Sequence, residues 1–377
     1  MQVHFRNSIF DINAEQWNKL ISDDTPFLRH EFLSALESEE CVGGESGWQP
    51  YYACLEQDNK LIASVPLYLK EHSWGEFVFD WAWAEAYERC GLPYYPKLVA
   101  TVPFTPITTA KILSLEHNAK IELQLINAIE QHAKERELSS IHLLFLEQET
   151  LTLLQQQGFF LRQSCQYHWF NDQFVNFDDY LNTLNSRKRK AIKRERRRIE
   201  EAGITFKCYQ GDGLSEAVIA QFHQFYCMTY WKKGHAPPLT ECFFQKIVET
   251  LPNTVMIMAA HDGSRIIAMA FFYVGANALY GRYWGCVEEY HSLHFATCYY
   301  QGIAYCIEHN VPFFHSGTQG EHKISRGFRP VATWSAHRIF NPVFDNALQR
   351  YTELEADHID KYIKQVETHH LPFKKLG

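Results

Sequence analysis

The chain has 377 residues, and its 36 basic and 44 acidic side chains give a formal net charge of −8 at pH 7. Apolar residues make up 46% of the sequence and aromatic residues 15%, which excludes a disordered chain and supplies a substantial core. No apolar run approaches the roughly 18 residues that span a bilayer, so we expect no membrane-spanning helix.

The first part of the chain alternates helical and strand-like patterns. In chain order these patterns predict a helix over 27–38, strands over 50–57 and 60–72, a strand over 75–83, a helix over 121–138, a buried strand over 141–148, a short helix ending at Gly158 and a strand over 161–170. The strand over 75–83 would direct an aromatic stripe into the core, formed by Phe77, Phe79, Trp81 and Trp83.

The second part repeats this alternation of helices and strands. In chain order it predicts a helix from 177 that continues through a basic segment, a strand over 203–210, a long helix over 215–234, three strands between 254 and 286, a helix over 293–310, a strand over 311–317 and a helical tail over 342–365. Because the order of elements recurs, two copies of one mixed α/β domain, 1–170 and 171–377, are the economical interpretation.

The ten cysteines are scattered and include no C-x-x-C pair. In a chain of this size, that pattern favours reduced thiols over a disulfide framework or a zinc ribbon. The first residues, MQVHFRNSIF, show no apolar segment after a basic start, so no signal peptide is expected. We therefore expect a cytoplasmic protein, which could also lie peripherally at the inner membrane surface.

Residues 187–198, RKRKAIKRERRR, carry nine basic side chains and one acid, Glu195. This segment alone is +8, so the rest of the chain is −16. Three interpretations stay open for it: a solvated helix face over Ile192 and Ile199, a site for phosphates of a nucleotide or tRNA, or a contact with an anionic surface.

The stretch from 279 to 337 holds the strongest signal for chemistry. Seven protonatable or cationic side chains fall within residues 315–337, interleaved with glycines: His315, Glu321, His322, Lys323, Arg326, Arg329 and His337. Charged residues rarely gather beside a core strand unless they bind or react with something. A solvated surface loop is the alternative.

The order of these segments resembles the FemAB-like group of N-acyltransferases, which consist of tandem GNAT-type domains and are related to Fem-type peptidyltransferases. The resemblance covers nearly the whole chain and is carried by PFLRHEFLSALE (26–37), GEFVFDWAWAEAY (75–87), YYPKLVATVPFTPI (94–107), SRKRKAIKRERR (186–197), LYGRYWGC (279–286), LHFATCYYQGI (293–303) and GTQGEHKISRGFRPV (317–331). It implies a mixed α/β fold and transfer of an acyl group to an amine.

The resemblance implies an acyl-CoA donor, and from the residues themselves we expect no permanently bound cofactor and no metal. However, the R/Q-x-x-G-x-G/A turn with which GNAT enzymes hold pyrophosphate has no clean copy in this chain. Residues 282–287, RYWGCV, keep only the arginine and the first glycine. An aminoacyl-tRNA donor, as in the Fem-type relatives, therefore stays open.

Acyl transfer to an amine needs a proton acceptor and donors that stabilise an oxyanion. Glu321 or His322 could be the base, and His294 could contact substrate or handle a proton. We expect the remaining members of the site to bind substrate: Arg282, Tyr283, His315, Gln319, Gly320, Lys323, Arg326 and Arg329. The competing hypothesis is a non-catalytic protein that uses the same residues and the basic segment to hold an anionic or RNA partner.

Overall fold

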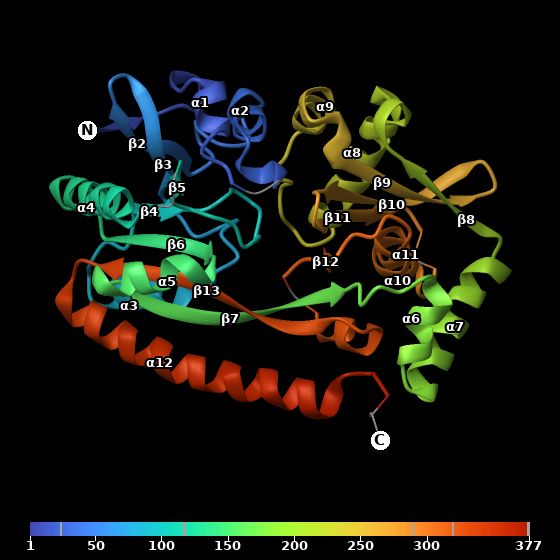
Figure 1. Cartoon of the computed structure of the whole chain (residues 1–377). Helices are drawn as coiled ribbons and strands as arrows, with labels where there is room; N and C mark the ends of the chain where they lie inside the picture. Colours follow the sequence, from blue (N-terminus) through green and yellow to red (C-terminus); the bar gives the residue numbers. More distant parts are fainter. Residues whose placement is uncertain (23–24, 116–117, 289, 319, 375–377) are drawn as a thin grey trace. The chain divides into compact units, whose positions relative to one another are not determined.

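The computed structural model describes residues 1–22, 25–115, 118–288, 290–318 and 320–374 (Figure 1). The chain divides into two compact units. Unit 1 comprises residues 1–165 and 332–361, and unit 2 comprises residues 166–331 and 362–377. These units differ from the two sequence halves expected above, because residues 332–361 belong with the first unit. The halves 1–170 and 171–377 as separate domains stay a prediction.

The sheet of unit 1 is mixed. Its strands run in the order β1 (Gln2–Arg6), β2 (Trp48–Gln57), β3 (Lys60–Lys70), β4 (Lys97–Ala100), β6 (Ser140–Leu146) and β13 (Arg329–Ile339), and β5 (Leu113–Ser114) pairs with β3. All neighbours in this order are antiparallel except β4 and β6, which are parallel. The turn between β2 and β3 lies at Asp58 and Asn59, as predicted, and both residues have positive φ.

The helices of unit 1 are α1 (Ala14–Asn18), α2 (His30–Ser38), α3 (Trp81–Arg89), α4 (Ala119–Glu135), α5 (Gln148–Gln156) and most of α12 (Pro342–Gln365). Helix α4 begins where the Asn118 side chain accepts a hydrogen bond from the backbone of Lys120. Its buried residues Leu125 and Ile129, one turn apart, pack into the same core cluster as Leu143 of β6. This packing explains why an amphipathic pattern and a wholly apolar strand follow one another in the sequence.

Unit 2 has the strand order β7 (Phe160–Phe170, from residue 166), β12 (Phe313–His315), β11 (Ala278–Cys286), β10 (Arg265–Val274), β9 (Val255–Asp262) and β8 (Ile204–Tyr209). Among the described strand pairs of this order, β11 and β12 are parallel and the others are antiparallel. Its helices are α6 (Phe177–Thr183), α7 (Ser186–Glu201), α8 (Glu216–Trp231), α9 (Glu241–Thr250), α10 (Leu293–Phe295), the π-helix η5 (Ala296–Tyr300) and α11 (Gln301–Glu308). A 3₁₀ helix, η6 (Glu321–Arg326), follows β12.

The two units repeat one order of elements, as predicted from the sequence. In unit 1, β2, β3 and β4 form an antiparallel meander, and helix α4 leads to β6, which is parallel to β4. In unit 2, β9, β10 and β11 form the meander, and α10, η5 and α11 lead to β12, which is parallel to β11. The expected mixed α/β class in two tandem copies is confirmed.

Two local predictions are wrong. Residues 81–89 form helix α3 and no strand, so the alternating aromatic residues do not share one buried face: Trp83 is buried, while Phe79 and Trp81 are exposed. The crowded loop expected up to His337 ends earlier, because residues 329–339 form β13. Among the described helices, none combines the length and the apolar composition that crossing a membrane requires.

Candidate active site

The parallel strands β11 and β12 separate soon after they pair. They are in register at only three positions, and the last pair is Tyr280 with His315. Strand β11 continues to Cys286, whereas β12 ends at His315, so a gap opens between them. A cavity of about 90 Å³ lies there. Its walls come from β10, β11, the helix that follows and the end of β12: Ala270, Phe271, Phe272, Gly281, Arg282, Tyr283, Trp284, His294, Cys298, Tyr299, Phe314 and Ser316.

Strand β11 contains a bulge at the cavity. Phe271 of β10 faces Tyr283, but the next residue, Phe272, faces Gly281, which leaves Arg282 as the extra residue. Bulges of this kind re-aim side chains and are common next to active sites. Arg282 is only partly exposed and lines the cavity, so its guanidinium places positive charge there.

Tyr283, the next expected site residue, also lines the cavity but packs mainly against helices α8 and α9. Its ring makes edge contacts with Tyr226 at 5.2 Å and Phe244 at 5.6 Å. Helix α8 approaches β11 so closely that a side chain at Gly285 would meet the Phe225 carbonyl oxygen at 2.0 Å. Tyr283 therefore supports the wall, while Arg282 supplies its charge.

The helical wall of the cavity contributes His294, Cys298 and Tyr299. Burial, with the nearby His322 and Lys323, lowers the pKa of His294 to about 4, so this imidazole is neutral at pH 7. Burial also raises the pKa of the Cys298 thiol well above its ordinary value. A protonated thiol is a weak nucleophile, so Cys298 is poorly suited to form a covalent intermediate.

Lys323 is the most deeply buried cation near the cavity, with 2% of its surface exposed. Its Nζ donates a hydrogen bond to the Gly317 carbonyl oxygen at 2.7 Å. Burial first, and the charge of Arg282 second, lower the pKa of Lys323 to about 7. At pH 7 this side chain is therefore divided between amine and ammonium, and an anion or a developing negative charge beside it favours the ammonium form.

Arg326, expected above to bind substrate, is engaged within the protein. Its Nη2 contacts the carboxylate of Glu195 at 3.0 Å, and its Nε donates to the Tyr300 hydroxyl at 3.0 Å. The guanidinium also lies 3.4 Å above the centre of the Phe295 ring. Tyr300 donates to Glu195 as well. The lone acid of the basic segment thus fixes α7 to η6.

The two residues expected as alternative bases occupy different places. The Glu321 carboxylate accepts a hydrogen bond from the Tyr362 hydroxyl at 2.8 Å and lines a separate cavity of about 290 Å³ beside Lys188 and His370. The Nε2 atom of His322 lies 3.0 Å from the Tyr299 hydroxyl, and Tyr299 lines the first cavity. Burial and the cations Lys323 and Arg326 lower the pKa of His322, so it is neutral at pH 7.

The remaining expected residues surround this core. His315 is buried, with its Nε2 atom 2.7 Å from the Gln166 amide oxygen, and burial holds its pKa well below the ordinary value. Arg329 is half-exposed and pairs with Asp172 at 2.6 Å. Gly320 precedes η6. Gln319 lies outside the described residues.

Sequence reasoning did not single out Trp284, Tyr299 or Ser316, which line the cavity. Trp284 could have been found from its position two residues after Arg282, because residues i and i+2 of a strand lie on the same face. His337, grouped above with the crowded stretch, lies instead in unit 1, where its Nδ1 atom is 2.6 Å from that of His142.

Helix α7 turns its apolar residues inward and a row of cations outward. Ile192 and Ile199 are buried. Lys193 pairs with Asp178 at 3.0 Å, and the Arg196 guanidinium lies 4.3 Å from the centre of the Phe177 ring. The exposed basic side chains are Arg187, Lys190, Lys193, Arg194, Arg197 and Arg198. We call Arg187, Lys190, Arg194 and Arg197, which share one helix face, the α7 cation row.

Comparison with known proteins gives one family and several structures. The model of the FemAB-like family, described as peptidoglycan biosynthesis or recognition, matches residues 8–375. The crystal structure of FemX matches with a TM-score of 0.55 and 10% identity, covering 93% of this chain and 100% of FemX.

A second structure is the C-terminal DUF2156 domain of a putative lysylphosphatidylglycerol synthetase from Agrobacterium fabrum, with a TM-score of 0.51, 10% identity and coverage of 90% and 96%. A tandem GNAT protein from the clavulanic acid biosynthesis pathway matches with a TM-score of 0.47, 8% identity and coverage of 90% and 99%. At such identities, the FemX and DUF2156 matches show a shared fold. No curated protein sequence matches this chain.

Proposed function

We propose that this chain, which belongs to the FemAB-like family of peptidoglycan biosynthesis or recognition, is a transferase that moves an acyl group from an anionic carrier to an amine. The observation that carries the proposal is the cavity where β11 and β12 separate. Arg282 lines this cavity, and the buried Lys323 lies beside it. Among the described lining residues, none is a carboxylate. Such a site stabilises negative charge that develops on a carbonyl oxygen.

The reaction follows from this electrostatic pattern. The neutral amine nitrogen attacks the carbonyl carbon, a C–N bond forms, and the electron pair of the C=O bond moves onto oxygen. Arg282 and Lys323 stabilise that oxyanion. When the pair returns, the bond between the carbonyl carbon and the carrier breaks, and the proton lost by the amine ends on the carrier's leaving oxygen or sulfur. No enzyme nucleophile is needed, because both substrates react within one complex.

His322 is the better placed of the two expected proton acceptors. Its hydrogen bond with Tyr299 connects it to the cavity wall, whereas Glu321 lines the other cavity. His294 also lines the cavity, but with a pKa of about 4 it is a weak base. We therefore assign the proton transfer to His322, with Tyr299 between it and the reacting amine.

Two carriers fit the charge pattern. The α7 cation row lies in the same unit as the cavity, and a row of this kind binds a polyanion such as tRNA, so we favour an aminoacyl ester of tRNA as the donor. An acyl-CoA thioester is the second candidate, because the narrow cavity suits a small acyl group and the CoA phosphates are also anionic.

The experiment offers both donors to the purified chain. A mixture of isotopically labelled aminoacyl-tRNAs and a mixture of short acyl-CoA thioesters are each incubated with amine acceptors, among them lysine-containing stem peptides of peptidoglycan. Mass spectrometry then detects acceptors that have gained the acyl mass. We expect transfer from the tRNA mixture that falls at least about a hundredfold in Arg282→Gln.

The control for this experiment is Arg265→Gln, an exposed arginine on β10 whose ion pair is with Glu288. It should transfer as the unmodified protein does. Transfer from acyl-CoA alone would select the second carrier. If ligands bind but no acceptor gains mass with either donor, the competing hypothesis of a non-catalytic binding protein replaces the proposal.

A further inference from the structure

Unit 1 holds a second group of side chains that the transfer reaction does not use. Residues 71–80 form a loop that follows β3 and precedes α3. Along this loop, polar and aromatic residues face opposite ways: Ser73, Glu76 and Asp80 are buried, whereas Trp74 and Phe79 are exposed. A loop built only to connect two elements would bury the aromatic residues and expose the carboxylates.

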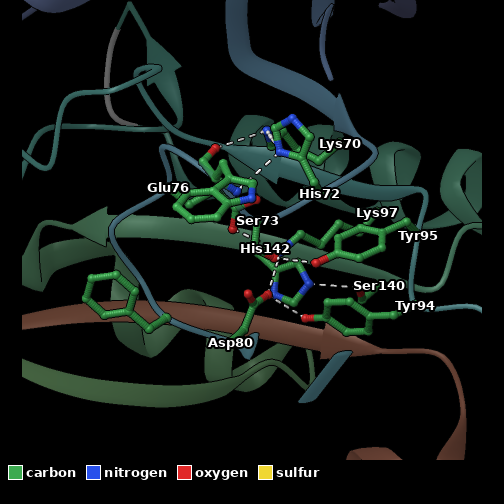
Figure 2. Close-up of polar contacts among 12 residues, drawn as sticks. Lys70, His72, Ser73, Glu76, Asp80, Tyr94, Tyr95, Lys97, Ser140 and His142 are labelled. Atoms are coloured by element: carbon green, nitrogen blue, oxygen red, sulfur yellow. Dashed lines mark hydrogen bonds and ion pairs between the residues drawn. The ribbon is translucent and has the colours of Figure 1, made fainter. Parts of the chain in front are cut away.

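The buried side of the loop converges on one ammonium, as Figure 2 shows. The Nζ atom of Lys97 donates to Ser73 Oγ at 2.9 Å, to Glu76 Oε2 at 2.9 Å and to Asp80 Oδ2 at 2.5 Å. The Tyr94 hydroxyl donates to the same Asp80 oxygen at 2.6 Å. Because an ammonium has three donors, Lys97 is saturated, and the loop is held at its beginning, middle and end.

The backbone of the loop is equally constrained. Gly75 has a φ of +83°, and a side chain there would meet the Phe104 ring at 2.6 Å. Phe77, a bulky residue, also has a positive φ of 61°. Conformations of this kind persist only where the surrounding structure over-determines them, and they gather at ligand-binding segments. The loop is therefore rigid before any ligand arrives.

The outer side of this rigid loop presents aromatic rings to solvent. Trp74 is 55% exposed, Phe79 52% and Trp81, the first residue of α3, 39%. The rings of Trp74 and Trp81 meet edge to face with their centroids 5.0 Å apart. We call Trp74 and Trp81, whose rings are in contact, the aromatic platform. Clustered exposed aromatic rings mark an interaction site, and fixed rings lose little entropy on binding.

The charges beside the platform select its partner. Glu85 and Glu88 follow Trp81 at helical spacing, and Glu71 precedes Trp74, so exposed carboxylates flank the rings. The one basic residue of α3, Arg89, pairs with Glu85 at 3.6 Å. Acidic flanks repel anionic lipids and nucleic acids but accept hydrogen bonds from hydroxyl groups.

We propose that the aromatic platform of unit 1 binds an uncharged saccharide, with the C–H face of a sugar ring on Trp74 or Trp81 and its hydroxyls toward the flanking carboxylates. Indole rings suit such a ligand, since they combine a broad apolar face with one polar edge. The proposal concerns binding alone and stands whether or not the chain transfers acyl groups.

The test is isothermal titration calorimetry with a tetramer of N-acetylglucosamine, without any acyl donor. We expect saturable binding with a Kd of roughly 0.1–5 mM, as for a few stacked rings. Trp74→Ala and Trp81→Ala should each weaken binding at least about tenfold, whereas Trp81→Tyr should keep most of it. The matched control is Trp231→Ala, which removes a 63% exposed indole from unit 2 and should change nothing.

Three outcomes would overturn the proposal. The first is no heat of binding at roughly 20 mM tetramer, well above the expected Kd. The second is equal binding by the unmodified protein and by the folded double variant Trp74→Ala/Trp81→Ala, with folding checked by circular dichroism. The third is platform-dependent binding to uncharged phosphatidylcholine vesicles in place of the saccharide, which would assign these rings to a membrane surface.

Discussion

Units 1 and 2 build the same element order but finish the parallel strand pair differently. In unit 1, the 18 residues 101–118 separate β4 from α4, whereas in unit 2 only the six residues 287–292 separate β11 from α10. Most of residues 101–114 are buried. In unit 1, this longer connection therefore packs into the space beyond the parallel strands. In unit 2, a cavity lies at the corresponding place.

A lysine marks the corresponding point in each unit. Two residues beyond the last pair of the parallel strands, Phe145 in unit 1 and Gly317 in unit 2 both have positive φ. Their carbonyl oxygens accept hydrogen bonds from Lys111 at 3.0 Å and from Lys323 at 2.7 Å.

The two lysines differ in how many further acceptors surround them. Lys111 also donates to the Thr109 hydroxyl at 2.7 Å and carbonyl oxygen at 3.0 Å, and it lies 3.4 Å from the Ile107 carbonyl oxygen. These contacts make Lys111 a structural residue. Among the described residues, Lys323 donates one short hydrogen bond, and its pKa is about 7. We propose that its charge acts on the substrate. The same position thus serves the core in one unit and the proposed chemistry in the other.

The largest expected effect separates the two lysines by activity. Lys323→Met removes a charge that the proposed oxyanion needs, so single-turnover transfer should fall by about 10²–10³-fold. Lys111→Met leaves the cavity of unit 2 intact, and its folded fraction should transfer at the normal rate. If both variants lost the same fraction of transfer activity per folded molecule, the two lysines would not differ in function.

The next effect is on stability and runs the opposite way. Lys111→Met leaves several buried oxygen atoms without a donor, which should lower the free energy of unfolding by about 2–4 kcal/mol. Lys323→Met removes a poorly solvated ammonium, so its free energy of unfolding at pH 7 should be unchanged or higher by up to roughly 4 kcal/mol. Urea unfolding of both variants measures this difference. A large destabilisation by Lys323→Met would mean that Lys323 is structural too.

The pH dependence sharpens the assignment of Lys323. The unfolded chain holds this proton up to its ordinary pKa of 10.5, while the folded chain releases it near 7. Between these values the unfolded state binds more protons, so the contribution of Lys323 to stability rises with pH across this window. Transfer should decline as pH rises through about 7, and Lys323→Arg should abolish that decline, because an arginine stays charged. An unchanged pH–rate profile in Lys323→Arg would contradict the role of the ammonium.

The smallest effect concerns the α7 cation row, which has no counterpart among the elements of unit 1 described above. Replacing Arg187, Lys190 and Arg194 with Gln should reduce the salt dependence of tRNA binding by roughly 0.7–0.9 in log–log slope for each lost contact. The control removes three exposed cations elsewhere, Lys60, Lys120 and Arg350, and should leave the slope unchanged. Filter binding between about 50 and 200 mM salt measures both. Equal slopes in the two variants would remove the tRNA interpretation of α7.

Much of the fold follows from local patterns that tertiary packing does not override. Strand β6 is buried along its whole length, as its apolar run predicted, and α7 is helical despite its repelling charges because Ile192 and Ile199 anchor it. The prediction for residues 77–83 was wrong because aromatic residues at every second position are typical of a strand. Asp80 lies within this pattern, and its carboxylate accepts a hydrogen bond from Lys97. That partner lies 17 residues away, so no local pattern could reveal it.

The sequence could predict which residues gather around the candidate site, but not which contacts each of them makes there. Arg282, His294 and Lys323 do gather at one gap, because strand ends after a parallel crossover meet at the same edge. Arg326 and Lys323 are both cations in the same short segment. Only the structure reveals that Arg326 pairs with Glu195 and donates a hydrogen bond to Tyr300. Such pairing depends on contacts from α7, more than a hundred residues away, and burial of this kind has no sequence signature.

The most direct test of the central claim maps where a donor's acyl group lies. A photoreactive aminoacyl group, attached through a stable amide to the 3′ end of a tRNA acceptor stem, is cross-linked to the purified chain, and the labelled peptides are identified by mass spectrometry. The account predicts labels on β11 and on the helix that carries His294 and Cys298, reduced by excess tRNA. Labels confined to residues of unit 1 would contradict it.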